Sequence, residues 1–484
     1  MGISYDDDEP KMGISYDDDE PVTAMLTADS ESAPEESISE KIVVQIFNKA
    51  DVALEKTDYR LVVELMGSGT EDRRCGVDIV TVLDVSYSMW GKRLEKLKTS
   101  MNFLVKKLSP FDRLSIVTFS SKADRLCPLT RMDKNGQAKI EMLINKLEAD
   151  NYTNITLGLQ TALSVLAHRR QHEGRTTAIM LVSDGEQSSG YDHPSTVDVS
   201  RVPVYTFGLG TDHDSKVLYE IASRSEKGTY SIADVEGADS ASLNIAFSSC
   251  LAGIISVVVQ DLELTVTQLD SDIQDVRAGN YDQTRDNESV TIPFGNLYNR
   301  ETRKTTVFLS LPLVQAQTTS DILRISYSFR PSGGGDLYEA PPIFATVTRT
   351  STPVTVEPVQ LTHEIARGDT ANAMREAREQ ADIHNYDGAK ATLSNQERSL
   401  DKLNPEGNEL IKALKYEVQE FLRLLREPEI YSEEGRAFAL SSQLSHGLQR
   451  FAARGDATQL LALAIPLVVL FANQAIEFDQ KTAN

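Results

Sequence analysis

Oxygen-bearing side chains follow two apolar runs of the sequence at the points where those runs end. Asp84, Ser86 and Ser88 come directly after VDIVTVL, and Asp184 follows TTAIMLVS. A third polar stretch, NYTN, contains Thr153 and precedes a run with helical spacing. Hard divalent cations take oxygen ligands, and Mg²⁺ usually combines few carboxylates with water. Two Asp and three hydroxyl side chains therefore predict a site for Mg²⁺, with Mn²⁺ or Ca²⁺ as alternatives.

The two apolar runs belong to a longer pattern in which strands and helices alternate. Near-continuous apolar runs are typical of parallel strands buried on both faces. We expect strands at 77–85, 113–120, 176–184 and 202–210, and helices at 93–108, 134–148, 154–170, 215–224 and 238–253. This alternation predicts a doubly wound, Rossmann-like α/β domain over residues 74–253, whose ligands lie beyond the carboxyl ends of the strands. Asp84 and Asp184 would end two neighbouring strands there.

The α/β segment is flanked by sequence of two other kinds. Residues 41–73 and 254–350 show strand periodicity broken by turn signals, which predicts an antiparallel β-sandwich with the α/β domain inserted into it. Residues 354–456 carry apolar residues at three- and four-residue spacing, which predicts a helical domain.

Charge is concentrated at the start of the chain. Residues 1–40 hold thirteen acids and one base, and MGISYDDDEP occurs at 1–10 and again at 12–21. Such an acidic, weakly apolar segment predicts a disordered tail, with an acidic docking motif as the alternative. The formal net charge of the whole chain is −23, which argues against nucleic-acid binding because phosphates need cationic partners.

The cysteines and the N-terminus bear on the compartment. Cys75, Cys127 and Cys250 are odd in number and far apart, so they predict neither a disulfide framework nor a zinc site. The N-terminus lacks the cationic and apolar run of a secretory signal. We therefore expect a reduced, cytoplasmic setting.

The three polar motifs together carry a resemblance to a known family. D-x-S-x-S at 84–88, Thr153 before Asn-Ile, and S-D-G at 183–185 resemble the metal-ion-dependent adhesion site of von Willebrand factor A domains. The resemblance implies Ser86, Ser88 and Thr153 as direct ligands, with Asp84 and Asp184 orienting water or binding directly. It also implies a non-catalytic module that binds a protein partner offering an acidic side chain to the metal.

A wider resemblance covers about residues 40–480. The runs at 206–223 and 248–264 and the C-terminal helices resemble plant proteins that join an A domain to a helical inter-domain module. Some of those relatives are RING-type ubiquitin ligases, and inter-alpha-trypsin inhibitor heavy chains have a similar domain order. The cysteines that a RING needs are absent from this chain. An alternative function is therefore a partner that recruits substrates to such ligases or competes with them. A metal-free scaffold is the third hypothesis.

Two residues depart from the family pattern beside the expected metal. Tyr87 and Tyr152 stand where many relatives have glycine. They represent either a harmless loop variation or a blocked or retuned site, since glycine permits close backbone approaches that other residues forbid.

Residues 457–484 form an apolar terminal segment. The stretch 457–476 has no charged residue, but its strongly apolar part, 460–472, is shorter than a bilayer core requires and contains Pro466. We expect a helix packed on the C-terminal helical domain, with a tail anchor in a membrane as the alternative.

Overall fold

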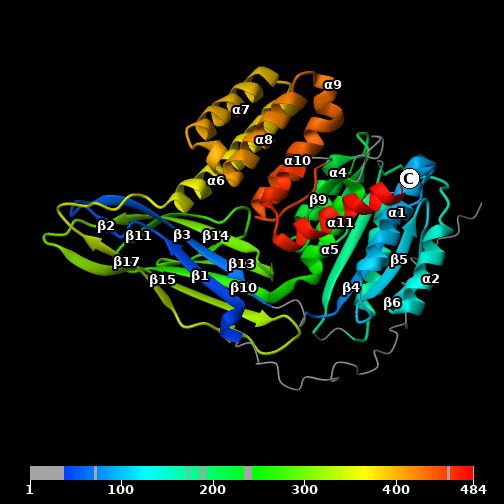
Figure 1. Cartoon of the computed structure of the whole chain (residues 1–484), viewed down its shortest axis with the longest axis horizontal. Helices are drawn as coiled ribbons and strands as arrows, with labels where there is room; N and C mark the ends of the chain where they lie inside the picture. Colours follow the sequence, from blue (N-terminus) through cyan, green and yellow to red (C-terminus); the bar gives the residue numbers. More distant parts are fainter. Residues whose placement is uncertain are drawn as a thin grey trace, which may run out of the picture.

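The computed structural model describes residues 38–69, 74–171, 174–184, 187–188, 192–233, 242–454 and 458–482. The predicted acidic tail lies almost entirely outside them, and Gly185 of the S-D-G motif lies outside them as well. Figure 1 shows three regions: an α/β region on the right, antiparallel sheets on the left, and helices above both.

The α/β region is built on a six-stranded sheet with the strand order β6-β5-β4-β7-β8-β9. All neighbouring pairs are parallel except β5 and β6. The strands are β4 (Val77–Asp84), β5 (Arg113–Phe119), β6 (Ala123–Arg131), β7 (Thr176–Ser183), β8 (Val204–Leu209) and β9 (Tyr230–Ala233). β5 and β6 therefore lie on one side of β4, and β7, β8 and β9 lie on the other, so the strand order reverses between β4 and β7. This is a Rossmann-like doubly wound fold, as expected from the sequence.

Helices cover both faces of this sheet. They are α1 (Lys92–Lys107), α2 (Lys134–Asn145), α3 (Ile155–Ala167), α4 (Ser215–Arg224) and α5 (Ser242–Ile255). In β4, Ile79 and Leu83 share a core with α1, α2 and α5, whereas Val80 and Val82 share another with α3 and α4. Alternate side chains of a strand point to opposite faces, so burial on both faces requires the near-continuous apolar sequence of β4.

Two edge strands of this sheet were not expected from the sequence. β6 pairs antiparallel with β5, and the short β9 pairs with β8. The burial of β6 is mixed, as expected for an edge, and it contains Pro128, which lacks the N–H that a central strand needs. Neither strand has the apolar density by which β4 and β7 were recognised.

The antiparallel region consists of two sheets, with orders β1-β3-β14-β11 and β12-β13-β10-β15-β17-β2. Their strands are β1 (Ile42–Phe47), β2 (Asp51–Val52), β3 (Thr57–Gly67), β10 (Val257–Gln268), β11 (Asp272–Arg277), β12 (Thr284–Arg285), β13 (Ser289–Tyr298), β14 (Thr302–Leu311), β15 (Thr318–Pro331), β16 (Tyr338–Glu339) and β17 (Ile343–Arg349). β3 pairs with β14 and β2 with β17, so strands that precede the α/β region complete sheets formed mainly after it.

The C-terminal helices are α6 (Val359–Asp382), α7 (Tyr386–Asp401), α8 (Glu409–Leu424), α9 (Pro428–Ile430) and α10 (Arg436–Gly447), and they share a hydrophobic cluster. Apolar residues continue at helical spacing over 431–453, which predicts a helix there, but α10 ends at Gly447. Gln449 has a positive φ, and Ile232 N then donates to Ala453 O, so the chain continues beside β9 instead.

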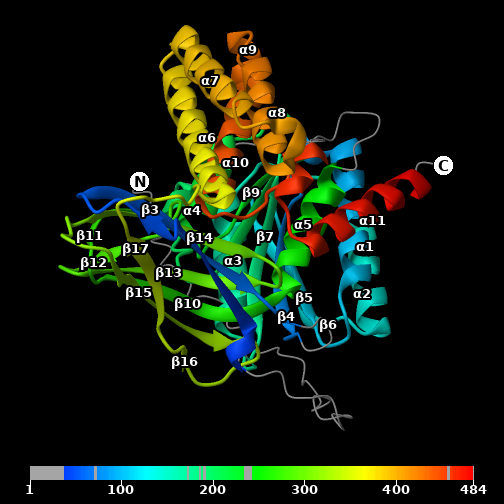
Figure 2. The same ribbon diagram turned by 60° about the vertical axis from the view of Figure 1, so that its left-hand side comes forward.

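The terminal helix α11 (Pro466–Thr482) corrects one expectation. It packs on α5 and reaches α1 of the α/β region (Figures 1 and 2), whereas the short helix before it, Thr458–Leu463, contacts α8 of the C-terminal helical domain. Phe478 lies 5.1 Å from Phe103 between ring centroids, and Lys107 Nζ donates to Gln474 Oε1 at 2.5 Å. Pro466 starts the helix, because a proline is compatible with the first helical position. None of the helices in the described part of the chain is both long and apolar enough to cross a membrane.

Candidate functional site

The candidate site lies where the strand order of the α/β sheet reverses. β4 and β7 are hydrogen-bonded neighbours, and Leu83 is paired with Val182 near their carboxyl ends. Asp84 is the last residue of β4, and Asp184 directly follows β7. In a doubly wound sheet this crevice is the usual place for a ligand.

Hydrogen bonds connect four of the five residues that the sequence singled out. Ser86 Oγ lies 3.0 Å from Ser88 Oγ, and Ser88 Oγ donates to Asp184 Oδ1 at 2.7 Å. Asp84 Oδ1 accepts from the backbone N–H of Ser86 at 2.9 Å. The D-x-S-x-S loop therefore folds back on its own aspartate and reaches the end of β7.

Thr153, the fifth residue, is buried in the loop between α2 and α3. Two backbone hydrogen bonds attach that loop to the D-x-S-x-S loop: Asp150 N donates to Val85 O at 2.8 Å, and Tyr87 N donates to Asn151 O at 3.0 Å. Asn154 then caps α3 by accepting from Leu157 N. The three motifs are thus held together by main-chain contacts.

The two carboxylates differ in their surroundings. Burial raises the pKa of Asp84 to about 6, hydrogen bonds from Ser183 and Ser86 oppose this shift, and the nearby charge of Asp184 adds to it. Asp184 forms an ion pair with Arg93, in which Nη1 lies 2.7 Å from Oδ2. Burial therefore makes Asp84 costly to ionise, whereas the negative charge of Asp184 is balanced by Arg93.

The donor chemistry fits a hard divalent cation. Every side chain of the set offers oxygen, and two carboxylates with three neutral hydroxyls match the preference of Mg²⁺ for few charged ligands plus water. Within the described residues, no three His, Cys, Asp or Glu side chains are grouped so that they could hold a metal ion. Any cation at this site would therefore depend on the hydroxyl groups.

Three aromatic side chains surround the site and project into solvent. Tyr87 is 72% exposed, Trp90 73% and Tyr152 67%. Tyr87 and Tyr152 both have negative φ, so neither position has a backbone conformation that requires glycine.

Sequence reasoning assigned no role to two residues of this cluster. Ser183 Oγ donates to Asp84 Oδ2 at 2.6 Å, and Arg93 pairs with Asp184. The position of Ser183 at a strand end was a usable signal. Arg93 had none, because an arginine in the first turn of a helix is ordinarily solvated.

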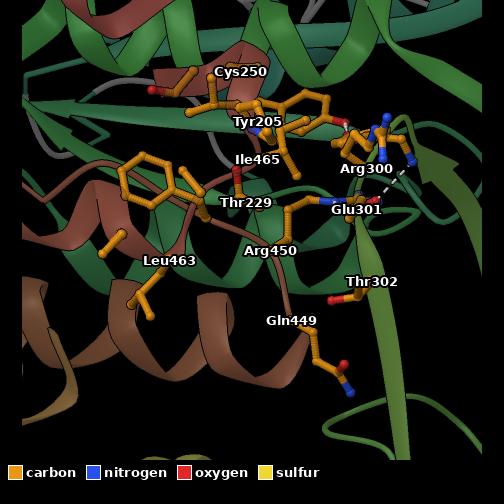
Figure 3. A pocket seen from close by; sticks show the side chains of 17 residues that line it. Tyr205, Thr229, Cys250, Arg300, Glu301, Thr302, Gln449, Arg450, Leu463 and Ile465 are labelled. Atoms are coloured by element: carbon orange, nitrogen blue, oxygen red, sulfur yellow. Dashed lines mark hydrogen bonds and ion pairs between the residues drawn. The ribbon is translucent and has the colours of Figure 1, made fainter. Parts of the chain in front are cut away.

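A separate hollow of about 170 Å³ lies where β8, α5, the segment at 298–302 and the C-terminal segment meet (Figure 3). Arg450 extends toward Glu301 there, with Nε 2.9 Å from Oε1. Tyr205 and Tyr298 join their hydroxyls at 2.7 Å. Burial raises the pKa of the Cys250 thiol well above its usual value. Because its polar groups are paired and its thiol is protonated, we assign this hollow a structural role between the α/β region and the antiparallel sheets.

Comparison with known proteins defines the class. The model of the von Willebrand factor type A domain matches residues 78–242, and a second model, described as VWA / Hh protein intein-like, matches residues 406–474. The chain thus contains a von Willebrand factor type A domain followed by a VWA/Hh intein-like region. Such domains are generally non-catalytic modules that mediate protein interactions.

Particular relatives share parts of the chain. E3 ubiquitin-protein ligase WAV3 of Arabidopsis thaliana is 29% identical over 195 residues, which is 40% of this chain and 25% of that protein. Inter-alpha-trypsin inhibitor heavy chain H6 of Homo sapiens is 29% identical over 164 residues, 30% of this chain and 12% of that protein. The match therefore spans a quarter or less of either relative.

A solved structure shares the fold over most of the chain. The von Willebrand factor type A protein from Catenulispora acidiphila has a TM-score of 0.61 and 15% identity, with 85% of this chain and 98% of that chain covered. This similarity extends beyond the α/β region, so the neighbouring sheets and helices belong to a shared arrangement.

Proposed function

We propose that the α/β domain binds a protein partner through a divalent cation held at Asp84, Ser86, Ser88, Thr153 and Asp184. Ser86, Ser88 and Thr153 would bind the cation directly, and Asp84 and Asp184 would orient its water. Mg²⁺ is the preferred ion, with Mn²⁺ or Ca²⁺ as substitutes. The cation would supply a strong local positive charge at the surface.

One observation carries this proposal. Three polar segments, far apart in the sequence, come together at the switch point of the sheet: side-chain hydrogen bonds link Ser86, Ser88 and Asp184, and backbone hydrogen bonds attach the loop that holds Thr153. Ordinary loop packing does not require two carboxylates to be buried beside each other, because their charges repel and lose hydration.

The partner should contribute an acidic side chain. Three of the donor groups are neutral hydroxyls, so a divalent cation stays under-compensated and can take a further anionic oxygen. The chain has a formal net charge of −23, which repels acidic partners at long range. Attraction would therefore have to come from the cation itself, whose charge dominates at short distance.

The first test uses Mg²⁺ alone. A cation that binds the native state raises the melting temperature by mass action. We expect an upward shift for the parent chain that is lost in Asp184→Ala and in Ser88→Ala, whose side chain is exposed. Ser200→Ala removes an exposed hydroxyl on a different loop and should keep the shift. No shift in the parent would favour a metal-free scaffold.

We also propose an association with RING-type ubiquitin ligases in the cytoplasm, either recruiting substrates to them or competing with them. The match to WAV3 supports the association with ligases. The three free cysteines support the cytoplasmic location, because disulfides are rare there. Copurification of a RING protein that depends on Mg²⁺ and is lost in chelator would link this association to the site. Copurification that is equal in chelator would place it on another surface.

The domain boundaries are proposed as well. Residues 41–73 and 254–350 would form one β-sandwich that carries residues 74–253 as an insertion, followed by a helical module at 354–456. The pairing of β3 with β14 supports this, and so does a hydrophobic cluster that includes Leu61 of β3 and Leu264 of β10. Limited proteolysis should cut between these units before it cuts within them.

A further inference from the structure

Arg93 joins the candidate site to a neighbouring loop. It lies in the first turn of α1, and its guanidinium bridges two carboxylates. Nη1 lies 2.7 Å from Asp184 Oδ2, and Nη2 lies 2.7 Å from Asp212 Oδ1. Asp212 belongs to the loop between β8 and α4, so one arginine connects that loop to the end of β7.

The surroundings of Arg93 are shaped to accept its guanidinium. Gly210, in the same loop, has a φ of +75°, and a Cβ there would lie 3.0 Å from both Arg93 Nη2 and Asp212 Oδ1. Any side chain at Gly210 would be conformationally strained and would crowd the ion pair. The glycine therefore gives the loop room to close around Arg93.

This ion pair competes with a cation for Asp184. Ser88 donates to one oxygen of Asp184 and Arg93 to the other, and the Asp184 side chain is fully buried. A guanidinium bound to a buried carboxylate neutralises it, and a fixed positive charge nearby repels a divalent ion. Both effects lower the affinity of the site for a cation.

We propose that Arg93 is an internal counter-ion that sets the cation affinity of the adhesion site. A cation at the site must share Asp184 with Arg93, and Asp212 gives the guanidinium a second acceptor. This inference rests on the proposed function. Arg93 acts through Asp184 and does not itself bind the cation.

The positive charge of Arg93 should also affect how strongly the occupied site attracts an acidic partner. Removing Arg93 would strengthen cation binding but would take one positive charge from the occupied site. An acidic partner would then be held less strongly by each occupied molecule. Arg93 would thus lower the affinity of the site for the cation and raise the affinity of the occupied site for a carboxylate of the partner.

The test compares Arg93→Met with the parent chain in a calorimetric titration with Mg²⁺. Methionine keeps much of the side-chain length and removes the charge. We expect the dissociation constant to fall about tenfold in Arg93→Met and to stay near the parent value in Arg93→Lys, which keeps the charge. Arg60→Met is the matched control, because Arg60 forms an ion pair with Glu357 between β3 and the segment before α6. It should leave the Mg²⁺ affinity unchanged.

A second readout does not depend on the titration. Without a cation, Arg93→Met leaves Asp184 buried beside Asp84 with no counter-charge, so its melting temperature in chelator should fall below that of the parent. Added Mg²⁺ should restore it, giving a larger cation-induced shift than the parent shows. A variant that loses stability and is not rescued by Mg²⁺ would contradict the proposal.

The outcomes separate this inference from the proposed function. If the parent and Arg93→Met bind Mg²⁺ equally, the counter-ion role is wrong and the adhesion site stands. If only Arg93→Met binds Mg²⁺, the counter-ion role is supported, and the proposal that the parent chain binds a cation is wrong. If neither binds, both are wrong.

Discussion

Ser183 Oγ donates a hydrogen bond of 2.6 Å to Asp84 Oδ2 and so ties the end of β7 to the end of β4. Both side chains are completely buried. The bond partly offsets the cost of placing the Asp84 carboxylate away from water, because a hydrogen bond to the ionised form favours that form.

Ser183→Ala should therefore weaken both the fold and the proposed cation site. Loss of a buried hydrogen bond to a charged group costs about 1–3 kcal/mol of unfolding free energy. We also expect a smaller Mg²⁺-induced rise in melting temperature. Ser115→Ala deletes another buried hydroxyl, which donates to Cys127 O at 2.8 Å. It should lower stability comparably without changing the Mg²⁺ response, and an equal loss of response in both variants would contradict a specific role for Ser183.

The aromatic rings beside the site should affect partner binding more than cation binding. Tyr87→Gly and Tyr152→Gly should leave the Mg²⁺ affinity within about twofold, because both rings are mostly exposed and exposed substitutions rarely disturb a site. Exposed aromatics contribute strongly to protein interfaces, so affinity for a bound partner should fall by about tenfold or more. Trp90 is the single tryptophan of the chain, and its fluorescence offers a local readout of both titrations. A marked gain in Mg²⁺ affinity would instead show that the rings obstruct the site.

A buried charge network in the helical region should control acid stability. Glu417 Oε1 lies 2.6 Å from Arg454 Nη1, and Glu417 Oε2 lies 2.6 Å from His446 Nε2. Burial raises the pKa of Glu417, but the charges of Arg454 and His446 outweigh it and lower the pKa to about 2. Because this pKa lies below the ordinary value of 4.5, the stabilisation is complete above pH 4.5 and is lost as the pH falls toward 2.

Glu417→Gln should lower the free energy of unfolding by about 3–5 kcal/mol at pH 7, since it leaves a buried arginine without its counter-charge. Urea titrations at pH 7, 4 and 3 measure this. The variant should lose less stability than the parent between pH 4.5 and 3. Glu420→Gln, one turn away and paired with Arg423 near the surface, serves as the control and should change stability by less than about 1 kcal/mol. Identical pH dependence of Glu417→Gln and the parent would refute the assignment.

The terminal helix should stabilise the α/β domain. Ala475 is fully buried in the cluster formed with α1 and α5, whereas Leu470 on the same helix is 49% exposed. Ala475→Asp buries an unpaired charge and should lower the melting temperature by several degrees, because such a change costs about 2 kcal/mol or more. Leu470→Asp adds the same charge on the exposed side and should change it little. Comparable losses in both variants would argue against packing of α11 on α5.

The strongest sequence signals predicted the elements that they describe. β4, β7 and α4 were expected within a few residues of their bounds, because burial on two faces demands continuous apolar sequence and an exposed helix demands a regular apolar stripe. β6 and β9 were missed because an edge strand is less buried and does not require continuous apolar sequence. The β-sandwich, the metal ligands and the acidic partner remain predictions.

The sequence by itself determined the alternation of buried strands with helices and the oxygen chemistry of the candidate site. Both follow from local properties: apolar periodicity, and side-chain types at the ends of apolar runs. Only the tertiary structure decided that Arg93 compensates Asp184, that Ser183 supports Asp84, and that α11 covers α5. These contacts join residues separated by about ninety or more positions, and their energies depend on burial and distance, which no local pattern encodes.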